Sequence, residues 1–279
     1  MRGTLRTASL QLRTAARVVR SGRPSVGRLL APLDERMVFV LGSPRSGTTF
    51  LARAIGSCPN FVDLGEVAAF KAEIPALAGL EPAEASRRIH GLLTVTCRLA
   101  LAGGLRAVEQ TPEAAFLGDA VLAAFPEATL VHVVRDGRDV VCSFRERGWL
   151  NAGRVGTDDA GLPLGAHRRF WVEAGRGEEF ERASDVRRAA WAWRRYVTAA
   201  RSLGERVTEV RYERLAAEPA AVADQLSVAL DAPLAALEEA LRAAHGASVG
   251  RFRRELTPAD LLEVEAEAGA LLADLGYLQ

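Results

Sequence analysis

Short apolar runs alternate with stretches of helical periodicity along the chain from residue 37 onward. Buried strands are predicted by the runs MVFVL (37–41), FVDL (61–64), LRAVEQT (105–111), ATLVHVV (128–134) and RVTEVRY (206–212). Helices are predicted by apolar residues at helical spacing over 48–55, 83–101, 113–124, 135–147 and 183–201, and from about residue 257. Strands separated by helices favour an α/β fold with a parallel sheet covered on both faces.

Residues 1–36 have a different pattern and are expected to form a basic N-terminal arm ahead of a single domain over 37–279. Leu5, Leu12 and Val19 recur at helical spacing among arginines. Organelle transit peptides and membrane-surface helices share this pattern. An arm that packs on the domain or stays loose has the same sequence, so the alternatives stay open. A Gly-rich passage between Arg147 and Gly165 is expected to be a long loop or lid.

Composition and charge narrow the function classes. The arm holds eight arginines against Asp34 and Glu35, so the rest of the chain is net acidic although the whole carries +1. This distribution argues against a nucleic-acid-binding body. Three scattered cysteines favour a reducing compartment. No apolar stretch is long enough to form a transmembrane anchor, so we expect a cytoplasmic enzyme. Arginine-rich, lysine-poor usage favours a bacterial source, and Lys71 is the single lysine.

The stretch GSPRSGTT (42–49) lies between the first strand and the first helix and has the spacing of a phosphate-binding loop. Backbone N–H groups and a helix N-terminus can surround a phosphate there. Thr48 stands where a nucleoside-triphosphate loop carries its lysine, which argues against γ-phosphoryl transfer. Arg45 offers a planar guanidinium to several oxygens of a smaller terminal group.

A second anion site is indicated after the fourth predicted strand. Asp136 follows that strand as a magnesium ligand would, but it is embedded between arginines in RDGRD. Arg135 lies at the strand end, Ser143 follows eight residues on, and Arg147 comes one helical turn later. Two anion sites without a metal site imply a nucleotide with phosphates at both ends.

These motifs resemble those of the sulfotransferases. PRSGTTFL is similar to their 5′-phosphosulfate loop, VVRDGRDVVCSFRER to their 3′-phosphate motif, and VRYERLAAEP to a later segment of the family. The likeness is greatest to the tyrosylprotein branch and to soluble bacterial members. It implies a P-loop-type parallel sheet flanked by helices, with helical insertions at the acceptor site. It also implies the donor 3′-phosphoadenosine 5′-phosphosulfate and no metal.

The resemblance assigns roles to individual residues. The 5′-phosphosulfate is expected on the loop residues Arg45, Ser46, Gly47, Thr48 and Thr49. The 3′-phosphate is expected on Arg135 and Ser143, with Arg147 where the tyrosylprotein branch has another arginine and Arg251 in GRFRREL near the C-terminus. Tyr212 matches a family tyrosine that approaches the nucleotide. Surface salt bridging for Arg147 and core packing for Tyr212 are the alternatives.

A proton acceptor is needed for the acceptor hydroxyl. Glu66 follows the second predicted strand and lands where tyrosylprotein sulfotransferases keep their catalytic base. Glu66 is therefore predicted as base and Arg45 as the group that neutralises the leaving phosphate. A helix-capping role for Glu66 stays open. Asp63 and His132 are weaker candidates, while His90, His167 and His245 lack supporting context.

One position departs from the family. Gln110 in EQTP stands where a lysine is common, so it can donate a hydrogen bond but supplies no charge. Either Arg45 carries the charge alone, or Arg251 or Arg253 contributes. A P-loop small-molecule kinase and a catalytically impaired nucleotide-binding protein are the competing functions. Residues 67–104 and 148–185 are expected to shape a site for a hydroxyl-bearing acceptor, which could be a small molecule, sugar, lipid or peptide tyrosine. The sequence does not indicate an oligomeric state.

Overall fold

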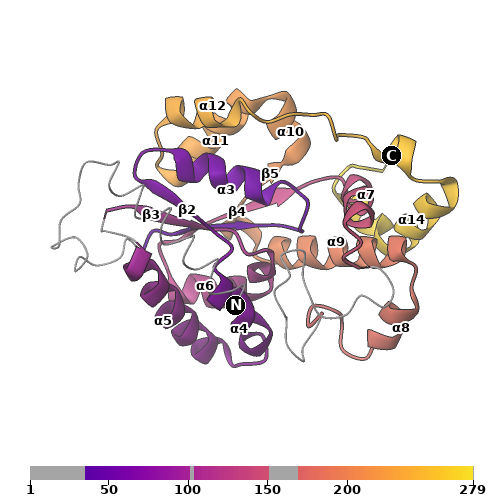
Figure 1. Ribbon diagram of the computed structural model, residues 1–279, viewed down its shortest axis with the longest axis horizontal. Coiled ribbons are helices and arrows are strands. Elements are labelled where there is room, and N and C mark those ends of the chain that lie inside the picture. The colour runs from indigo at the N-terminus through magenta and orange to yellow at the C-terminus, as the bar shows by residue number, and fades with distance from the viewer. Residues whose placement is uncertain (1–34, 101–103, 151–168, 279) are drawn as a thin grey trace.

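The computed structural model describes residues 35–100, 104–150 and 169–278 (Figure 1). The predicted basic arm, apart from Glu35 and Arg36, lies outside these described residues. Most of the Gly-rich loop predicted between Arg147 and Gly165 lies outside them as well.

A parallel sheet of five strands forms the centre of the fold, in the order β2-β3-β1-β4-β5. Its strands are β1 (Val38–Leu41), β2 (Phe61–Gly65), β3 (Arg106–Glu109), β4 (Thr129–Val134) and β5 (Val207–Arg211). Each predicted strand is therefore confirmed, and so is the parallel α/β architecture.

Alternating side chains of β1 enter two different cores. Val38 and Val40 pack into the cluster that contains Leu51 and Leu226, whereas Phe39 and Leu41 pack into the opposite cluster. All four β1 side chains are buried. Because successive strand residues point to opposite faces, an uninterrupted apolar run is what a sheet covered on both sides requires.

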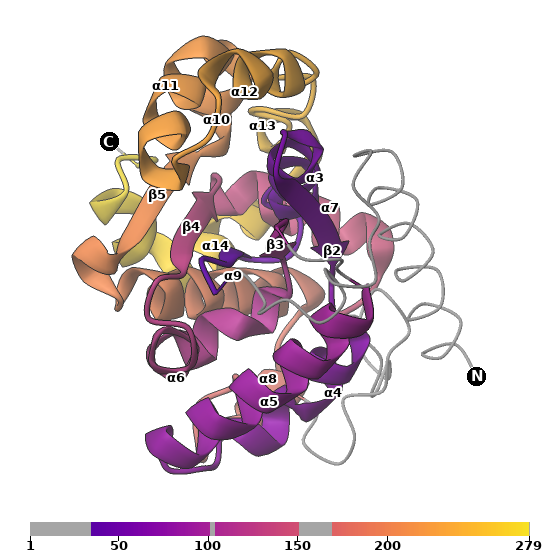
Figure 2. The same cartoon turned by 90° about the vertical axis from the view of Figure 1, so that its left-hand side faces the viewer.

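Helices cover both faces of the sheet (Figures 1 and 2). One face carries α3 (Thr48–Ser57), α10 (Tyr212–Ala217), α11 (Pro219–Leu230) and α12 (Leu234–Leu241). The other carries α4 (Ala68–Leu77), α5 (Pro82–Ala100), the 3₁₀ helix η1 (Pro112–Leu117) and α6 (Gly118–Ala124). A third cluster joins α7 (Gly137–Arg147), α8 (Gly177–Arg182), α9 (Asp185–Arg201), α13 (Phe252–Glu255) and α14 (Pro258–Asp274). A short 3₁₀ turn, η3 (Gly204–Arg206), precedes β5.

Several helical segments differ from the prediction, among them α8 and α13, which were not predicted. The helix α4 was not predicted, because it contains Pro75 and its apolar residues do not form one clear stripe. The segment predicted as one helix over 113–124 begins instead with the 3₁₀ turn η1, where Ala114 N–H donates to Thr111 O over 3.0 Å. The predicted C-terminal helix is confirmed as α14, and Thr257 with Asp260 forms its capping box.

The carboxyl ends of all five strands lie along one edge of the sheet because the strands are parallel. The phosphate loop follows β1, Glu66 follows β2, Gln110 follows β3, Arg135 follows β4 and Tyr212 follows β5. Parallel α/β sheets bind ligands outside this edge. The candidate site is therefore assembled from five turns that are far apart in the sequence.

Candidate functional site

The loop between β1 and α3 adopts a compact turn. Gly42 has φ 149° and Gly47 φ 103°, while Arg45 also lies in the left-handed region at φ 73°. A side chain at residue 42 would place a Cβ 2.6 Å from Val133 O, so the loop packs directly on β4. Ser46 N–H donates to Ser43 O over 3.1 Å and closes the turn.

Helix α3 begins at this loop and points its N-terminus into a cavity. Gly47 is the N-cap and supplies no side-chain hydrogen bond to the first turn. Helix N-termini leave several N–H groups without intrahelical partners and carry partial positive charge. The end of α3 therefore provides donors for an anion.

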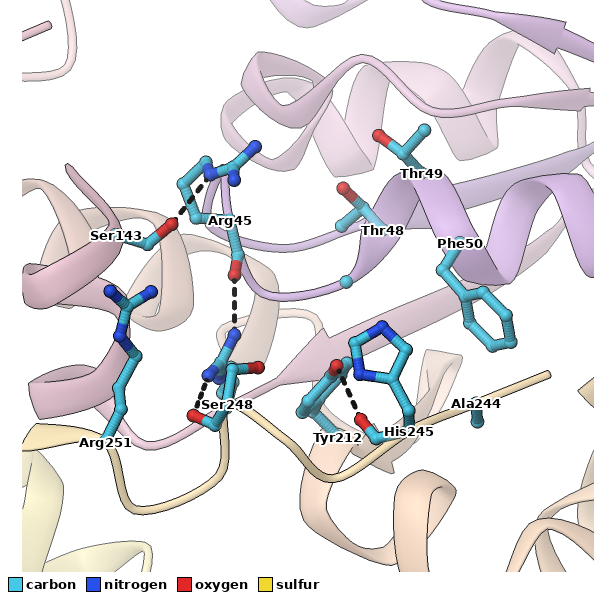
Figure 3. A pocket seen from close by; sticks show the side chains of 12 residues that line it. Arg45, Thr48, Thr49, Phe50, Ser143, Tyr212, Ala244, His245, Ser248 and Arg251 are labelled. Carbon is cyan, nitrogen blue, oxygen red and sulfur yellow. Dashed lines mark hydrogen bonds between the residues drawn. The ribbon is translucent and has the colours of Figure 1, made fainter. Parts of the chain in front are cut away.

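The cavity has a volume of about 320 Å³, within the range of roughly 300–1,000 Å³ that is typical of small-molecule sites. Figure 3 shows its wall from close by. It is lined by Arg45, Gly47, Thr48, Thr49, Phe50, Arg135, Ser143, Tyr212, Ala244, His245, Ser248 and Arg251. Eight of the predicted nucleotide residues thus line one cavity, although they come from four separate segments.

Arg45 links the phosphate loop to helix α7. Its Nε donates to Ser143 Oγ over 2.9 Å (Figure 3). Its guanidinium also lies over the Trp149 ring, 5.5 Å from the ring centre. These contacts set Arg45 beside the residue that was predicted for the other anion site.

Arg135 is buried at the carboxyl end of β4. It donates to Ser248 O over 2.5 Å and to Arg45 O over 3.4 Å, and its guanidinium stacks over Tyr212 at 4.6 Å. The Nε atom of Arg135 is buried and has no hydrogen-bond partner among the described residues. A buried donor of this kind favours an anionic ligand.

The carboxylates near Arg135 are already engaged. Asp136 caps α7 and accepts from Arg138 N–H, Nε and the guanidinium, over 2.9, 3.0 and 2.7 Å. Asp139 accepts from the N–H groups of Gly250 and Phe252, over 2.7 and 3.1 Å. Within the described ranges, no group of three His, Cys, Asp or Glu residues is arranged to hold a metal ion.

Tyr212 forms one wall of the cavity. A Cβ at Gly47 would lie 2.6 Å from Tyr212 Cδ2, so the ring packs against the loop where only glycine fits. The Tyr212 hydroxyl donates to His245 O over 3.2 Å (Figure 3). Tyr212 therefore joins the loop to the segment around His245.

The segment 244–251 was only partly foreseen. It places His245 and Ser248 at the cavity, together with the predicted Arg251. The single histidine in ALRAAHGAS carries no motif, and only the folded chain brings it beside Tyr212. Phe50, which also lines the cavity, follows the loop motif directly but was not singled out.

Arg251 lines the cavity but is tied to two carboxylates. Its guanidinium pairs with Glu146, and with Glu255 over 2.8 Å. The hydrogen bonds that Arg251 donates to Glu146 and Glu255 raise the pKa of Arg251 above its ordinary value. Arg253, the other cation considered from this segment, lies over the Phe252 ring at 4.9 Å and does not line the cavity.

Two predicted nucleotide residues are not part of the cavity wall. Arg147 is exposed in the last turn of α7. Ser46 is fully buried beneath the loop, and its Oγ has no hydrogen-bond partner among the described residues. For these two residues, as for the eight that line the cavity, a role in binding the nucleotide stays a prediction.

Glu66 lies apart from the cavity, at the end of β2. Its carboxylate accepts from Lys71 Nζ over 2.8 Å. Lys71 Nζ also lies 3.4 Å from Glu113 Oε2. The helix that follows, α4, has Val67 as its N-cap with no side-chain cap, and Val67 N–H donates to Glu109 over 3.1 Å. Glu66 therefore precedes the N-cap of α4, whose first turn contains no acidic residue.

Gln110 connects the Glu66 region with the phosphate loop. Its Oε1 accepts from Thr49 Oγ1 over 3.1 Å, and its backbone N–H donates to Gly65 O over 3.2 Å. With Oε1 facing Thr49, the amide nitrogen is the part of Gln110 that can donate to a ligand. The preceding Glu109 is fully buried, and burial raises its pKa to about 7.

The two alternative bases, His132 and Asp63, form contacts within the fold. His132 is buried within β4, 3.3 Å from the Glu209 carboxylate, and it holds the pKa of that carboxyl below its ordinary value. Asp63 accepts from Gly65 N–H over 2.7 Å and shapes the end of β2. Neither lines the cavity.

No helix in the described part of the chain is both long and apolar enough to cross a bilayer.

Comparison with known proteins gives a family match over just more than half of the chain. The model of a sulfotransferase family matches residues 86–236. This region contains Arg135, Ser143 and Tyr212 but begins after the phosphate loop. A search of curated proteins found no match.

Several solved structures share the fold. A sulfotransferase domain from the curacin biosynthetic pathway has 16% identity and a TM-score of 0.54, with 86% of this chain and 98% of that chain covered. The sulfotransferase domain of the Synechococcus PCC 7002 olefin synthase has 17% identity and a TM-score of 0.54, over 86% and 96%. Sulfotransferase STF9 from Mycobacterium avium has 15% identity and a TM-score of 0.53, over 94% and 81%. At these identities the likeness concerns the fold alone.

Proposed function

Because the chain belongs to the sulfotransferase family, we propose that it transfers the sulfuryl group of 3′-phosphoadenosine 5′-phosphosulfate to an acceptor hydroxyl. The hydrogen bond between Arg45 and Ser143 is the observation that carries the proposal. It brings the phosphate loop and the Arg135 region to one cavity, which suits a nucleotide with anionic groups at both ends.

The two ends of the donor are assigned by the local chemistry. The N-terminus of α3, with Thr48, Thr49 and Arg45, would hold the 5′-phosphosulfate. Arg135 and Ser143, with Arg251 nearby, would hold the 3′-phosphate. Arg135 Nε lacks a partner among the described residues. This buried donor fits a bound anion.

The transfer would proceed in one displacement. The acceptor oxygen forms a bond to sulfur while the bond from sulfur to the 5′-phosphate oxygen breaks, and its electron pair stays on the departing phosphate. Glu66 takes the hydroxyl proton. Arg45 and the amides of α3 neutralise the charge that grows on the leaving phosphate. Gln110 can donate a hydrogen bond to the moving group without adding charge.

Arginine and backbone amides, without a metal ion, are proposed to supply the positive charge of the site. Asp136 is the carboxylate placed where a magnesium ligand would follow a strand, yet it is bound by Arg138. The sulfuryl group carries less negative charge than a phosphoryl group, so it needs less neutralisation.

A small-molecule kinase is the competing enzyme class. It would need a lysine in the loop and a carboxylate available to magnesium. The loop has Thr48 at the lysine position, and Asp136 is engaged. These observations favour the sulfuryl donor over ATP.

The acceptor site is proposed beside Glu66, at the end of β2. The segments expected to shape it include α4 and α5, from residues 67–104, and α8, from residues 148–185. Phenols, sugars, lipids and peptide tyrosines remain the candidate acceptor classes, with the tyrosylprotein likeness one reason to include peptides.

Sulfuryl transfer can be tested with radiolabelled donor and a panel of phenols, sugars, long-chain alcohols and tyrosine peptides. Labelled product with at least one acceptor class supports the proposal. Tight binding of adenosine 3′,5′-bisphosphate without transfer to any acceptor or to water would instead identify a nucleotide-binding protein that has lost its chemistry.

A further inference from the structure

The only lysine of the chain is buried beside the proposed base. Lys71 lies on α4, and its side chain is 1% exposed. Its Nζ lies 2.8 Å from Glu66 Oε2 and 3.4 Å from Glu113 Oε2. Glu113 belongs to η1, which follows the Gln110 turn, so the ammonium joins the ends of two neighbouring strands.

A buried ion pair at this position is weak evidence for a role in stability alone. Its neighbours on α4, Phe70 and Ile74, are core residues, and an apolar side chain could occupy the same space. Removing an ammonium from water costs free energy, which a buried ion pair often recovers only in part. An ion pair retained at such a position is a candidate for a functional role.

Lys71 cannot reach a substrate directly. Of the three side chains in the cluster, Glu66 is 18% exposed, whereas Glu113 is 4% exposed and Lys71 almost fully covered. The Glu113 carboxylate also accepts from Tyr196 OH over 3.2 Å, which ties it to α9. Any effect of the ammonium on a ligand must therefore pass through the Glu66 carboxylate.

We propose that Lys71 is a positioning residue for Glu66: it holds the carboxylate ionised and oriented at the end of β2. This inference rests on the proposed function, in which Glu66 accepts the proton of the acceptor hydroxyl. The positive charge missing at Gln110 is thus found behind the base and not beside the moving sulfuryl group.

Charges near Glu66 then tune the pH dependence of turnover in opposite directions. Lys71 favours the ionised carboxylate, whereas the negative charges of Glu113 and of ionised Glu109 disfavour it. Burial is the main cause of the raised pKa of Glu109, and the nearby Glu66 charge adds to it. A purely structural ion pair would stabilise the fold without setting this balance.

A single lysine allows a direct test by NMR. The full chain is produced with lysine labelled at Cε and Nζ, so that one side-chain signal reports on Lys71. We expect the Nζ protons to exchange slowly with water, and the Cε shift to follow an acidic titration that disappears in Glu66→Gln. A solvent-like signal, or one unchanged by Glu66→Gln, overturns the ion pair whatever the protein catalyses.

The kinetic test compares Lys71→Met, Lys71→Arg and Glu113→Gln, with transfer measured to the acceptor found in the panel or to water. For Lys71→Met we expect kcat to fall about 10- to 100-fold, with adenosine 3′,5′-bisphosphate affinity within about twofold of wild type. The acid limb of the kcat profile should move up by about one pH unit, and Lys71→Arg should restore part of both. Glu113→Gln should move the acid limb of the kcat profile to lower pH.

Glu267→Gln is a matched control, because Glu267 is a largely buried carboxylate paired with Arg187 and Arg194 on the α9–α14 side. It should lower thermal stability and leave the pH profile in place. If the wild type neither binds the bisphosphate nor transfers the sulfuryl group, the proposed function fails. If the wild type is active and the Lys71 and Glu113 variants keep its pH profile, the positioning role alone fails. Glu113→Gln keeps the test decisive should Lys71→Met not fold.

Discussion

Arg45 Nε donates to Ser143 Oγ over 2.9 Å, and the two residues are 98 positions apart in the chain. The bond connects the turn after β1 with helix α7, which follows β4. These strands are neighbours in the sheet, so their following turns meet at its carboxyl edge. One hydrogen bond thus joins the two elements that are proposed to bind the anionic ends of the donor.

Arg135→Ala should weaken binding of adenosine 3′,5′-bisphosphate about 10- to 100-fold, because a buried charge-assisted contact is lost. The affinity for adenosine 5′-phosphosulfate, which lacks the 3′-phosphate, should fall much less. Calorimetry with both ligands measures the difference. Arg214→Ala, an exposed arginine paired with Glu218, is the control. Equal weakening of both ligands contradicts the assignment of Arg135 to the 3′-phosphate.

Glu66→Gln should reduce kcat about 100- to 10,000-fold, the usual range for losing a general base. Donor affinity should stay near that of the wild type, because Glu66 does not line the nucleotide cavity. Single-turnover transfer and bisphosphate titration separate the two quantities. A variant that loses affinity but turns over bound donor normally would show that Glu66 is not the base.

Gly47→Ala should both destabilise the fold and impair donor binding. The residue has φ 103°, and a Cβ there would lie 2.6 Å from the Tyr212 ring. Gly204→Ala is a useful comparison, since Gly204 has φ 60° with no atom within 4 Å of an added Cβ. Backbone strain of about 1–2 kcal/mol is expected in both. Only Gly47→Ala should lose more stability than this and bind the bisphosphate weakly. Thermal melts measure the loss of stability, and calorimetry measures the binding.

Stability should fall as pH rises between about 4.5 and 7 through Glu109. Burial raises the pKa of this carboxyl from 4.5 to about 7 in the folded protein. In that window the folded state holds the proton more tightly than the unfolded chain, so its contribution is complete below pH 4.5 and is lost toward pH 7. The slope from one group is at most about 1.4 kcal/mol per pH unit.

Glu109→Gln removes that titration. Chemical denaturation at several pH values should show a flatter profile for the variant than for the wild type across this window. Parallel profiles would mean that Glu109 does not bind a proton there. Glu84→Gln, which removes a half-buried carboxylate paired with Arg87 and Arg88, controls for a general charge effect.

The sequence was sufficient for the central strand β1 because it is an unbroken apolar run. Met37, Phe39 and Leu41 enter one core, and Val38 and Val40 the other, so the run itself indicates cover on both faces. The helix α4 escaped prediction since Pro75 and apolar residues around its axis obscure the period. The sequence pattern alone predicts a helix that buries one apolar stripe and a strand that buries both faces.

The site was predictable where its residues lie within a motif. Arg45, Thr48, Arg135 and Ser143 belong to two short segments that follow strands, and the cavity contains all four. Sequence spacing also placed Glu66 at the end of β2.

Contacts between residues that only folding brings together could not be predicted from the sequence. His245 and Ser248 belong to a segment without a motif and reach the cavity through Tyr212 and Arg135. The pairing of Lys71 with Glu113 joins α4 to η1, two elements whose types were not predicted. These long-range pairs depend on strand order, which a single sequence does not specify.

The central claim is that the cavity holds an adenosine ligand through anions at both of its ends. Calorimetric titration of the full chain with adenosine 3′,5′-bisphosphate, and separately with ATP and magnesium, tests it most directly. The account predicts tight binding of the bisphosphate without added metal and weak binding of magnesium ATP. Tight binding of magnesium ATP together with no heat from the bisphosphate would contradict it.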